Sequence, residues 1–244
     1  MVDPRTSTIT DRLKGISRII AVSSGKGGVG KSLIATTLAL ELANRGCKVG
    51  LFDIDFTSPT THIILGAHNV QPKEEKGLVP PVVNGLEYMS LVYYTSNHAI
   101  PLRGEDTSNA LIELLAITLW GKLDYLVIDM PPSIGDAVLD LIRLVENIEF
   151  LIVTTPSRLA FETVRKLASL LQELKVPIIG VVENMKMNRE DSIRLQAEKL
   201  GLHYLAGIAF DPKVEKAIGN PGMLLETAIA HQIKKIVAQN LERG

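Results

Sequence analysis

Five apolar, β-branched runs are spaced along the chain of 244 residues, and helical patterns lie between them. The runs are RIIAVSS, CKVGLFDID, DYLVIDMPP, EFLIVTTPS and VPIIGVVENM. They lack the alternation of a half-exposed strand, which is typical of strands buried on both faces of a parallel sheet. The segments SLIATTLALELANRG, DAVLDLIRLVEN and FETVRKLASLLQELK have helical spacing. The alternation predicts an α/β fold, a doubly wound, mostly parallel sheet with helices on both faces, in a single domain over residues 1–244.

Residues 67–109 are less regular than the rest of the chain. The stretch contains Pro72, Pro80 and Pro81 together with a cluster of charged residues. It is interpreted either as a surface excursion with a short hairpin or as a loop that faces a partner, because long irregular loops in compact domains are often functional.

Charge and cysteine content limit the classes of function. The net charge is −1 and there is one cysteine, Cys47. No global positive field attracts nucleic acid or anionic lipid, and no disulfide can form within the chain. The first fifteen residues lack a signal-peptide core, and no apolar run approaches the length of a membrane span. We therefore expect a cytoplasmic protein with neither a nucleic-acid nor a membrane partner.

The C-terminal stretch TAIAHQIKKIVAQNLERG has one apolar side, formed by Ile229, Ile233, Ile236 and Val237. Amphipathic helices with aromatic residues and a basic face can lie on membranes. This stretch is aliphatic and has only one basic pair, so it is predicted to pack in the core.

The loop GKGGVGKS, between the first strand and the first long helix, matches two patterns. Gly25, Gly27 and Gly30 fit the dinucleotide fingerprint G-x-G-x-x-G, and Asp53 and Asp55 lie near the distance at which an acid would bind ribose. Gly25, Gly30, Lys31 and Ser32 fit the phosphate loop G-x-x-x-x-G-K-[ST].

Three features favour the phosphate loop. Lys31 would reach the β- and γ-phosphates and Ser32 would place a hydroxyl on Mg²⁺, whereas a dinucleotide needs neither. Asp129 closes a second apolar strand, where a phosphate-loop enzyme needs an acid for Mg²⁺ and the dinucleotide scheme needs none. The sequence therefore predicts a site for ATP or ADP with Mg²⁺.

The second residue of the motif, Lys26, carries a resemblance to a known family. The loop GKGGVGKS is similar to the deviant Walker A motif of the MinD, ParA and nitrogenase iron protein group. The segments GLFDIDFTSPTTHIILG, WGKLDYLVIDMPPSIGDA, GVVENM and FDPKVEKA resemble the Mrp branch, and the likeness extends from about Arg12 to Leu225. It implies a homodimer that encloses two ATP molecules and hydrolyses them, with Lys26 reaching the partner's phosphates.

The resemblance also implies roles for single residues. Lys26, Lys31 and Asp55 would be catalytic, with Asp55 orienting the attacking water, while Asp53, Asp129 and Ser32 would serve the Mg²⁺ shell. The residues expected to contact the nucleotide are Gly25, Lys26, Gly27, Gly28, Val29, Gly30, Lys31, Ser32 and Leu33, then Gly135 near the γ-phosphate, Asn184 at the adenine, and Asp211 and Pro212 beside the base.

The cysteines depart from the Mrp pattern. Mrp-type proteins that carry iron–sulfur clusters usually have a C-x-x-C pair soon after the ENM segment, and here that stretch reads ENMKMNREDSIRLQAEKLG. Two copies of Cys47 fall short of the usual four thiolates. We therefore expect the chain to belong to the branch similar to HypB. That branch inserts nickel during hydrogenase maturation together with a HypA-type chaperone. The alternatives are an iron–sulfur cluster carrier of Mrp type and a positioning ATPase like ParA or MinD.

Overall fold

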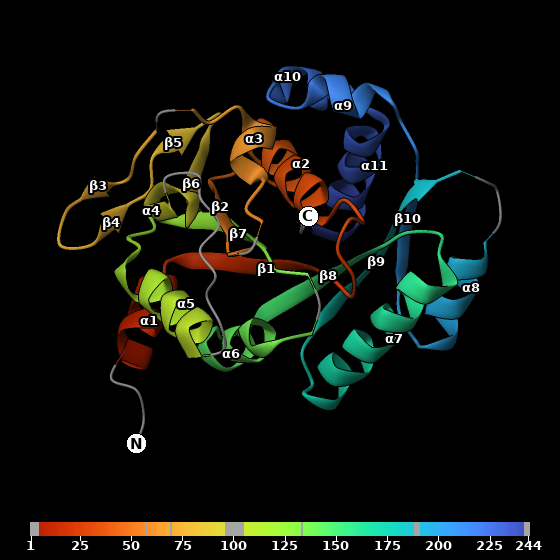
Figure 1. The fold of residues 1–244 in the computed structure, drawn as a ribbon, viewed down its shortest axis with the longest axis horizontal. Coiled ribbons are helices and arrows are strands. Elements are labelled where there is room, and N and C mark those ends of the chain that lie inside the picture. The colour runs from red at the N-terminus through yellow and green to blue at the C-terminus, as the bar shows by residue number, and fades with distance from the viewer. Residues whose placement is uncertain are drawn as a thin grey trace.

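The computed structural model describes residues 5–56, 58–68, 70–95, 105–132, 134–187 and 191–241. An eight-stranded sheet crosses the molecule in the order β10-β9-β8-β1-β7-β2-β6-β5, and a separate hairpin pairs β3 with β4 (Figure 1). The strands are β1 (Ile16–Ser24), β2 (Val49–Asp53), β3 (Lys73–Glu74), β4 (Leu78–Val79), β5 (Val82–Val83), β6 (Leu86–Ser90), β7 (Leu123–Asp129), β8 (Ile148–Thr154), β9 (Ile178–Lys186) and β10 (Tyr204–Ala209).

Every pairing in the large sheet is parallel except the one between β5 and β6. The five predicted strands are all present, and the predicted fold class is confirmed. At β1 the order of successive strands reverses, since β7 lies on one side and β8 on the other. Ligands of doubly wound sheets bind outside the carboxyl ends of the strands at such a point.

Helices cover both faces of the sheet (Figure 1). They are α1 (Arg5–Leu13), α2 (Lys31–Asn44), α3 (Thr61–Leu65), α4 (Val92–Thr95), α5 (Glu105–Ile117), α6 (Asp136–Leu144), α7 (Arg158–Glu173), α8 (Ser192–Lys199), α9 (Lys213–Ala217), α10 (Pro221–Leu224) and α11 (Ala228–Ile236), followed by a π-helical segment at Val237–Leu241. α2, α3 and α11 lie on one face, and α1, α5, α6 and α7 lie on the other.

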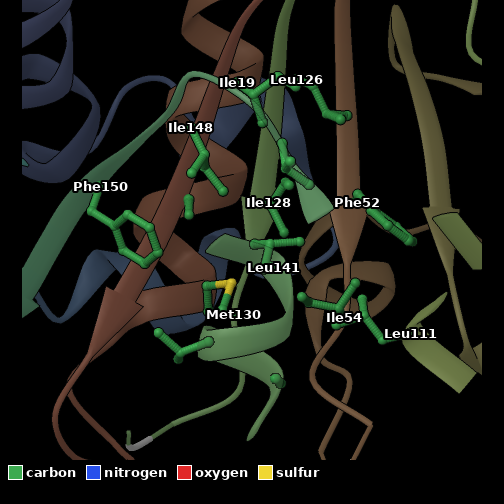
Figure 2. Packing of buried hydrophobic residues seen from close by; sticks show 14 of the residues in the cluster. Ile19, Phe52, Ile54, Leu111, Leu126, Ile128, Met130, Leu141, Ile148 and Phe150 are labelled. Atoms are coloured by element: carbon green, nitrogen blue, oxygen red, sulfur yellow. The ribbon is translucent and has the colours of Figure 1, made fainter. Parts of the chain in front are cut away.

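Two apolar layers hold the sheet between its helices. Figure 2 shows part of one layer, in which Ile19, Phe52, Ile128 and Phe150 of the strands meet Leu141 of α6. In the other layer α2 is buried on nearly all sides, because it lies between the sheet and α11. Ile229, Ile233, Ile236 and Val237 are buried there, which confirms core packing of the C-terminal stretch. No helix in the described part of the chain combines the length and the apolar character needed to cross a bilayer.

The irregular stretch contains more regular structure than the sequence predicted. It includes the expected hairpin, β3–β4, but also β6, which pairs in parallel with β2 inside the main sheet. Residues 96–104 lie outside the described residues. The interpretation as a loop that faces a partner stays a prediction.

Candidate functional site

The glycine-rich loop joins the carboxyl end of β1 to the start of α2. Gly28 and Gly30 have φ angles of 77° and 83°, in the left-handed region that favours glycine. A Cβ at Gly30 would lie 2.3 Å from Nδ2 of Asn184, and a Cβ at Gly25 would lie 2.2 Å from Oγ1 of Thr163 in α7. Neighbouring elements therefore leave no room for side chains at these two positions.

A cleft of about 370 Å³ opens over the loop. Its lining combines the loop, the segment after β2 and the segment after β7. The lining residues are Ser24, Lys26, Gly27, Gly28, Gly30, Lys31, Ser32, Leu33, Asp55, Ser58, Thr60, Ile64 and Pro132. Gly25 and Val29 are not among them: Gly25 packs against α7, and Val29 is buried.

Lys31 is buried beneath this cleft among acidic side chains. Its Nζ lies 2.5 Å from Oδ1 of Asp129 and 3.9 Å from Oδ2 of Asp55, and donates to Oγ of Ser32 at 3.3 Å. The sheet register places these groups together, because Asp129 pairs with Asp53 across β7 and β2. The structure thus brings the predicted lysine, hydroxyl and three carboxylates to one edge of the sheet.

Burial changes the acidity of two of these acids. Asp53 is fully buried, and its burial and then the negative charge of Asp129 raise its pKa to about 7, against the lowering effect of Thr61. The pKa of Asp129 is also raised, chiefly by burial, while Lys31 lowers it. The positive charge of Lys31 therefore favours the ionised form of Asp129.

The donor set fits a magnesium ion bound with phosphate. Oδ2 of Asp129 is buried without a hydrogen-bond partner. The hydroxyl of Ser32 lies close enough to this carboxyl group to lower its pKa. The described residues contain no group of three or more His, Cys, Asp or Glu side chains that could hold a metal by themselves. Mg²⁺ is usually held by one or two protein oxygens plus substrate phosphates and water, so the set is sufficient for it.

Lys26 and Gly135 are both exposed. Lys26 lines the cleft, and its main-chain carbonyl accepts from Oγ of Ser24. Gly135 precedes α6 and does not line the cleft. In the segment after β7, the residue that lines the cleft is Pro132. The exposed position of Lys26 leaves its side chain accessible to a second molecule.

A small apolar pocket adjoins the cleft through Leu33. Its lining residues are Leu33, Asn184, Met185, Ala209, Phe210, Asp211, Val214 and Ile229. Asn184 also donates through Nδ2 to the carbonyl of Val29 at 2.9 Å, so it supports the phosphate loop from below. The sequence resemblance gave no sign of this second contact.

Asp211 lines the small pocket, but its carboxylate is engaged by the main chain. Oδ2 accepts from the amide of Ala228 at 3.0 Å, and Oδ1 accepts from the amide of Lys213 at 2.9 Å. These bonds lower its pKa, that from Ala228 most. Asp211 therefore fixes the starts of α9 and α11, and Pro212 lies outside the pocket lining.

Three contacts of the site were not predicted. Thr163 packs against Gly25, and Thr61 and Tyr88 form a buried hydrogen-bond chain to Asp53. Thr61 lies in the segment resembling switch I, so a hydroxyl eight residues after a buried acid was a usable signal. Thr163 and Tyr88 come from α7 and β6, and only the tertiary structure brings them to the site.

The model of the ParA/NUBPL family, described as iron-transfer P-loop NTPases, matches residues 15–242. The chain belongs to this family. An "Iron-sulfur cluster carrier protein" of Methanocaldococcus jannaschii is 34% identical over 254 residues, which cover 96% of the chain and 88% of the relative. One of Escherichia coli K12 with the same name is 42% identical over 179 residues, covering 72% of the chain and 48% of the relative.

The match spans 63% of the similar Pseudomonas fragi protein and about half of the E. coli one. Among solved structures, a nucleotide-binding protein from Archaeoglobus fulgidus in complex with ADP has a TM-score of 0.78 at 29% identity, covering 91% of this chain and 93% of that one. MinD from Pyrococcus furiosus supports the fold assignment. Its TM-score is 0.69 at 23% identity, covering 91% of this chain and 97% of that one.

NUBPL-family membership confirms the phosphate loop over the dinucleotide pattern and the resemblance to the Mrp and MinD group. It corrects the expected branch. The reported relatives are named as iron–sulfur cluster carriers, so the comparisons favour that alternative and give no support to nickel insertion, to HypB or to a HypA-type partner. The absence of C-x-x-C misled the prediction, because the rest of the chain is similar to carriers that are named for a cluster.

Proposed function

We propose that the chain is a Mg²⁺-dependent ATPase that works as a homodimer and couples its nucleotide state to the assembly of iron–sulfur centres. One observation carries the ATPase part. Lys31 lies between Asp129 and Asp55 at the ends of adjoining strands, directly beneath a cleft floored by a glycine loop. Phosphoryl transfer requires mainly positioning and charge neutralisation, and these groups supply both.

Each group has a distinct task in the proposed reaction. The loop amides and the positive end of α2 bind phosphate, and Lys31 exchanges its contact with Asp129 for the β- and γ-phosphates. Asp129 and Ser32 then face Mg²⁺, which neutralises phosphate charge when it is bound. Asp55 orients the attacking water from the loop after β2.

The small apolar pocket is the proposed adenine site. Leu33, Met185 and Phe210 offer apolar contacts to a base, and Asn184 is the polar residue that would read its edge. Because Asn184 also holds the carbonyl of Val29, base binding and loop geometry share one side chain.

The homodimer is proposed from Lys26. Its exposed side chain at the rim of the cleft supports contact with the phosphates of a second molecule, where it would neutralise transition-state charge as an arginine finger does. Loss of Lys26 should then remove hydrolysis while binding persists.

The cluster is a proposed substrate, and the chain by itself does not fit a complete site for it. Four thiolates usually hold a cluster, and two chains offer two copies of Cys47. Cys47 also precedes β2, at the strand end opposite Asp53 and the cleft. We therefore propose that this chain supplies the nucleotide-driven step and that a partner protein supplies cluster ligands.

The test compares ATP hydrolysis and cluster transfer in one preparation. The parent, Lys26→Ala and Asp55→Asn are assayed with Mg-ATP, and Asp124→Asn serves as the matched control, since Asp124 lies at the opposite end of β7. We expect both site variants to bind ATP and to lose most turnover, while the control matches the parent. Equal turnover in Lys26→Ala and the parent would refute the role in the partner's site.

The cluster part is tested by transfer of a labelled cluster from a scaffold to an apo iron–sulfur protein, with the chain present in ATP or in ADP. The proposal expects a rate that depends on which nucleotide is bound. A transfer rate that is the same with ATP and with ADP would contradict the proposal. ATP-dependent binding of nickel would instead favour nickel insertion.

A further inference from the structure

A buried chain of hydrogen bonds links β6 to the segment that carries Asp55. Oγ1 of Thr61 donates to Oδ2 of Asp53 at 2.6 Å and lies 2.9 Å from the hydroxyl of Tyr88. All three residues are fully buried. A threonine hydroxyl has one hydrogen, so with Thr61 donating to the carboxylate, Tyr88 must donate to Thr61. Burial holds the pKa of Tyr88 well above its usual value, which keeps this donor protonated.

Asp53 also binds the main chain on both sides of the following loop. Its Oδ1 accepts from the amide of Asp55 at 3.0 Å, and its Oδ2 accepts from the amide of Thr61 at 3.2 Å. One carboxylate therefore ties the first residues after β2 to the first residue of α3. The path between them carries Asp55 and the cleft residues Ser58 and Thr60.

The other end of α3 is fixed by a separate contact. The amide of Gly219 donates to the carbonyl of Ile64 at 3.1 Å, and a Cβ at Gly66 would lie 2.5 Å from the carbonyl oxygen of Gly219. This close packing holds the C-terminal end of α3 in place. The hydrogen bonds of Asp53 hold both ends of the loop before α3, at Asp55 and at Thr61.

Asp53 and Asp129 differ in what their oxygens contact. Both oxygens of Asp53 accept from the loop or from Thr61, whereas Oδ2 of Asp129 is buried without a partner. The two neighbouring carboxylates thus differ in role: Asp129 has an oxygen available for a metal ion, and Asp53 is hydrogen-bonded to the loop.

We infer that Asp53, Thr61 and Tyr88 form a clasp that positions Asp55 for ATP hydrolysis, with Thr61 and Tyr88 as positioning residues that touch neither substrate nor metal. The inference rests on the proposed ATPase function, because it assigns the clasp to the water-orienting acid. Loss of the clasp should lower turnover and leave nucleotide affinity nearly unchanged, since the phosphate loop itself stays intact.

The experiment compares Thr61→Val, Thr61→Ser and Tyr88→Phe with the parent, and uses Thr118→Val as the matched control. Thr118 is another buried threonine, whose hydroxyl donates to the carbonyl of Leu114 in α5, away from the cleft. Turnover, ATP affinity and amide hydrogen exchange over residues 53–61 are measured for each protein.

Thr61→Val removes the hydroxyl from both of its contacts, so we expect kcat to fall by about tenfold or more, with ATP affinity changed less than about twofold. Tyr88→Phe removes only the outer donor and should lower kcat by about threefold to fivefold. Thr61→Ser retains the hydroxyl and should stay within about twofold of the parent. Exchange over residues 53–61 should accelerate in Thr61→Val and not in Thr118→Val.

The clasp is overturned if Thr61→Val hydrolyses ATP as fast as Thr118→Val, or if Thr61→Ser is as slow as Thr61→Val. Failure of the proposed function has a different signature, namely a parent protein that does not hydrolyse ATP at all. In that case the exchange measurement decides alone: unchanged exchange in Thr61→Val refutes the clasp, and accelerated exchange supports it as a means of ordering the loop.

Discussion

Replacing Lys31 with methionine should destabilise the protein as well as weaken nucleotide binding. Methionine is similar in length to lysine and is uncharged, so the change mainly removes the positive charge that lies 2.5 Å from Asp129 and 3.9 Å from Asp55. Oδ2 of Asp129 already has no partner, and its Oδ1 would lose the ammonium group. The variant would therefore retain buried acids without a compensating cation.

The size of the effect follows from burial. Removing one member of a buried ion pair costs about 3–5 kcal/mol, because the remaining charge stays desolvated. Lys31 lowers the pKa of Asp129, so without Lys31 that pKa rises further above its usual value. A carboxyl with a raised folded-state pKa stabilises most at low pH and loses that contribution as pH rises. The deficit of Lys31→Met should thus grow as the pH rises.

Urea unfolding followed by circular dichroism measures this directly. At about pH 8 we expect Lys31→Met to lose about 3–5 kcal/mol, and the double variant Lys31→Met with Asp129→Asn to recover most of the loss. Lys122→Met, at an exposed loop lysine, is the control and should stay within about 0.5 kcal/mol of the parent. A Lys31→Met protein as stable as the control, or one whose deficit shrinks as the pH rises, would refute this reasoning.

Further predictions concern the loop, the buried acid, the base pocket and the cysteine. Gly25→Ala should cost about 1–3 kcal/mol of stability. Adding Thr163→Ala should not restore the stability, because the main-chain carbonyl carbon of Thr163 also lies 2.6 Å from the added Cβ. A double variant as stable as the parent in urea unfolding would contradict this. The folded-state pKa of Asp53 is raised to about 7, so the parent should lose about 2–3 kcal/mol of stability relative to Asp53→Asn between about pH 5 and pH 8. Thermal scans in which this stability difference stays constant or rises with pH would contradict the prediction. Asn184→Ala should weaken ATP binding by about tenfold, through loss of the loop contact and the base contact, and unchanged calorimetric affinity would count against both. Cys47→Ala should hydrolyse ATP like the parent, and impaired hydrolysis would contradict its placement away from the cleft.

The sequence predicted the five strands that contain a continuous apolar run, and missed β6 and β10, which lie on either side of them in the main sheet. β1, β2, β7, β8 and β9 each contain a continuous buried run of four or more residues, which leaves little choice of structure. β6 (Leu86–Ser90) follows Pro80, Pro81, Asn84 and Gly85, whose turn propensity dominated the pattern. Its parallel pairing with β2 supplies the stabilisation that local propensity does not, and such long-range pairing leaves no periodic signal.

The site was predictable to the extent that its chemistry is local. Lys31 and Ser32 follow from one octapeptide, and Asp129 follows from its place at a strand end. The contact of Thr163 with Gly25 and the donation from Tyr88 to Thr61 depend on how α7 and β6 pack, so no spacing reveals them.

Binding of Mg-ATP at the glycine loop is the claim on which the other assignments depend. Isothermal titration calorimetry of the parent and of Lys31→Met with Mg-ATP tests it most directly, with NAD titrated in parallel. We expect uptake of about one ATP per chain by the parent, loss of that uptake in Lys31→Met, and no heat with NAD. A parent that binds NAD and not ATP, or a Lys31→Met variant that binds ATP as tightly as the parent, would contradict it.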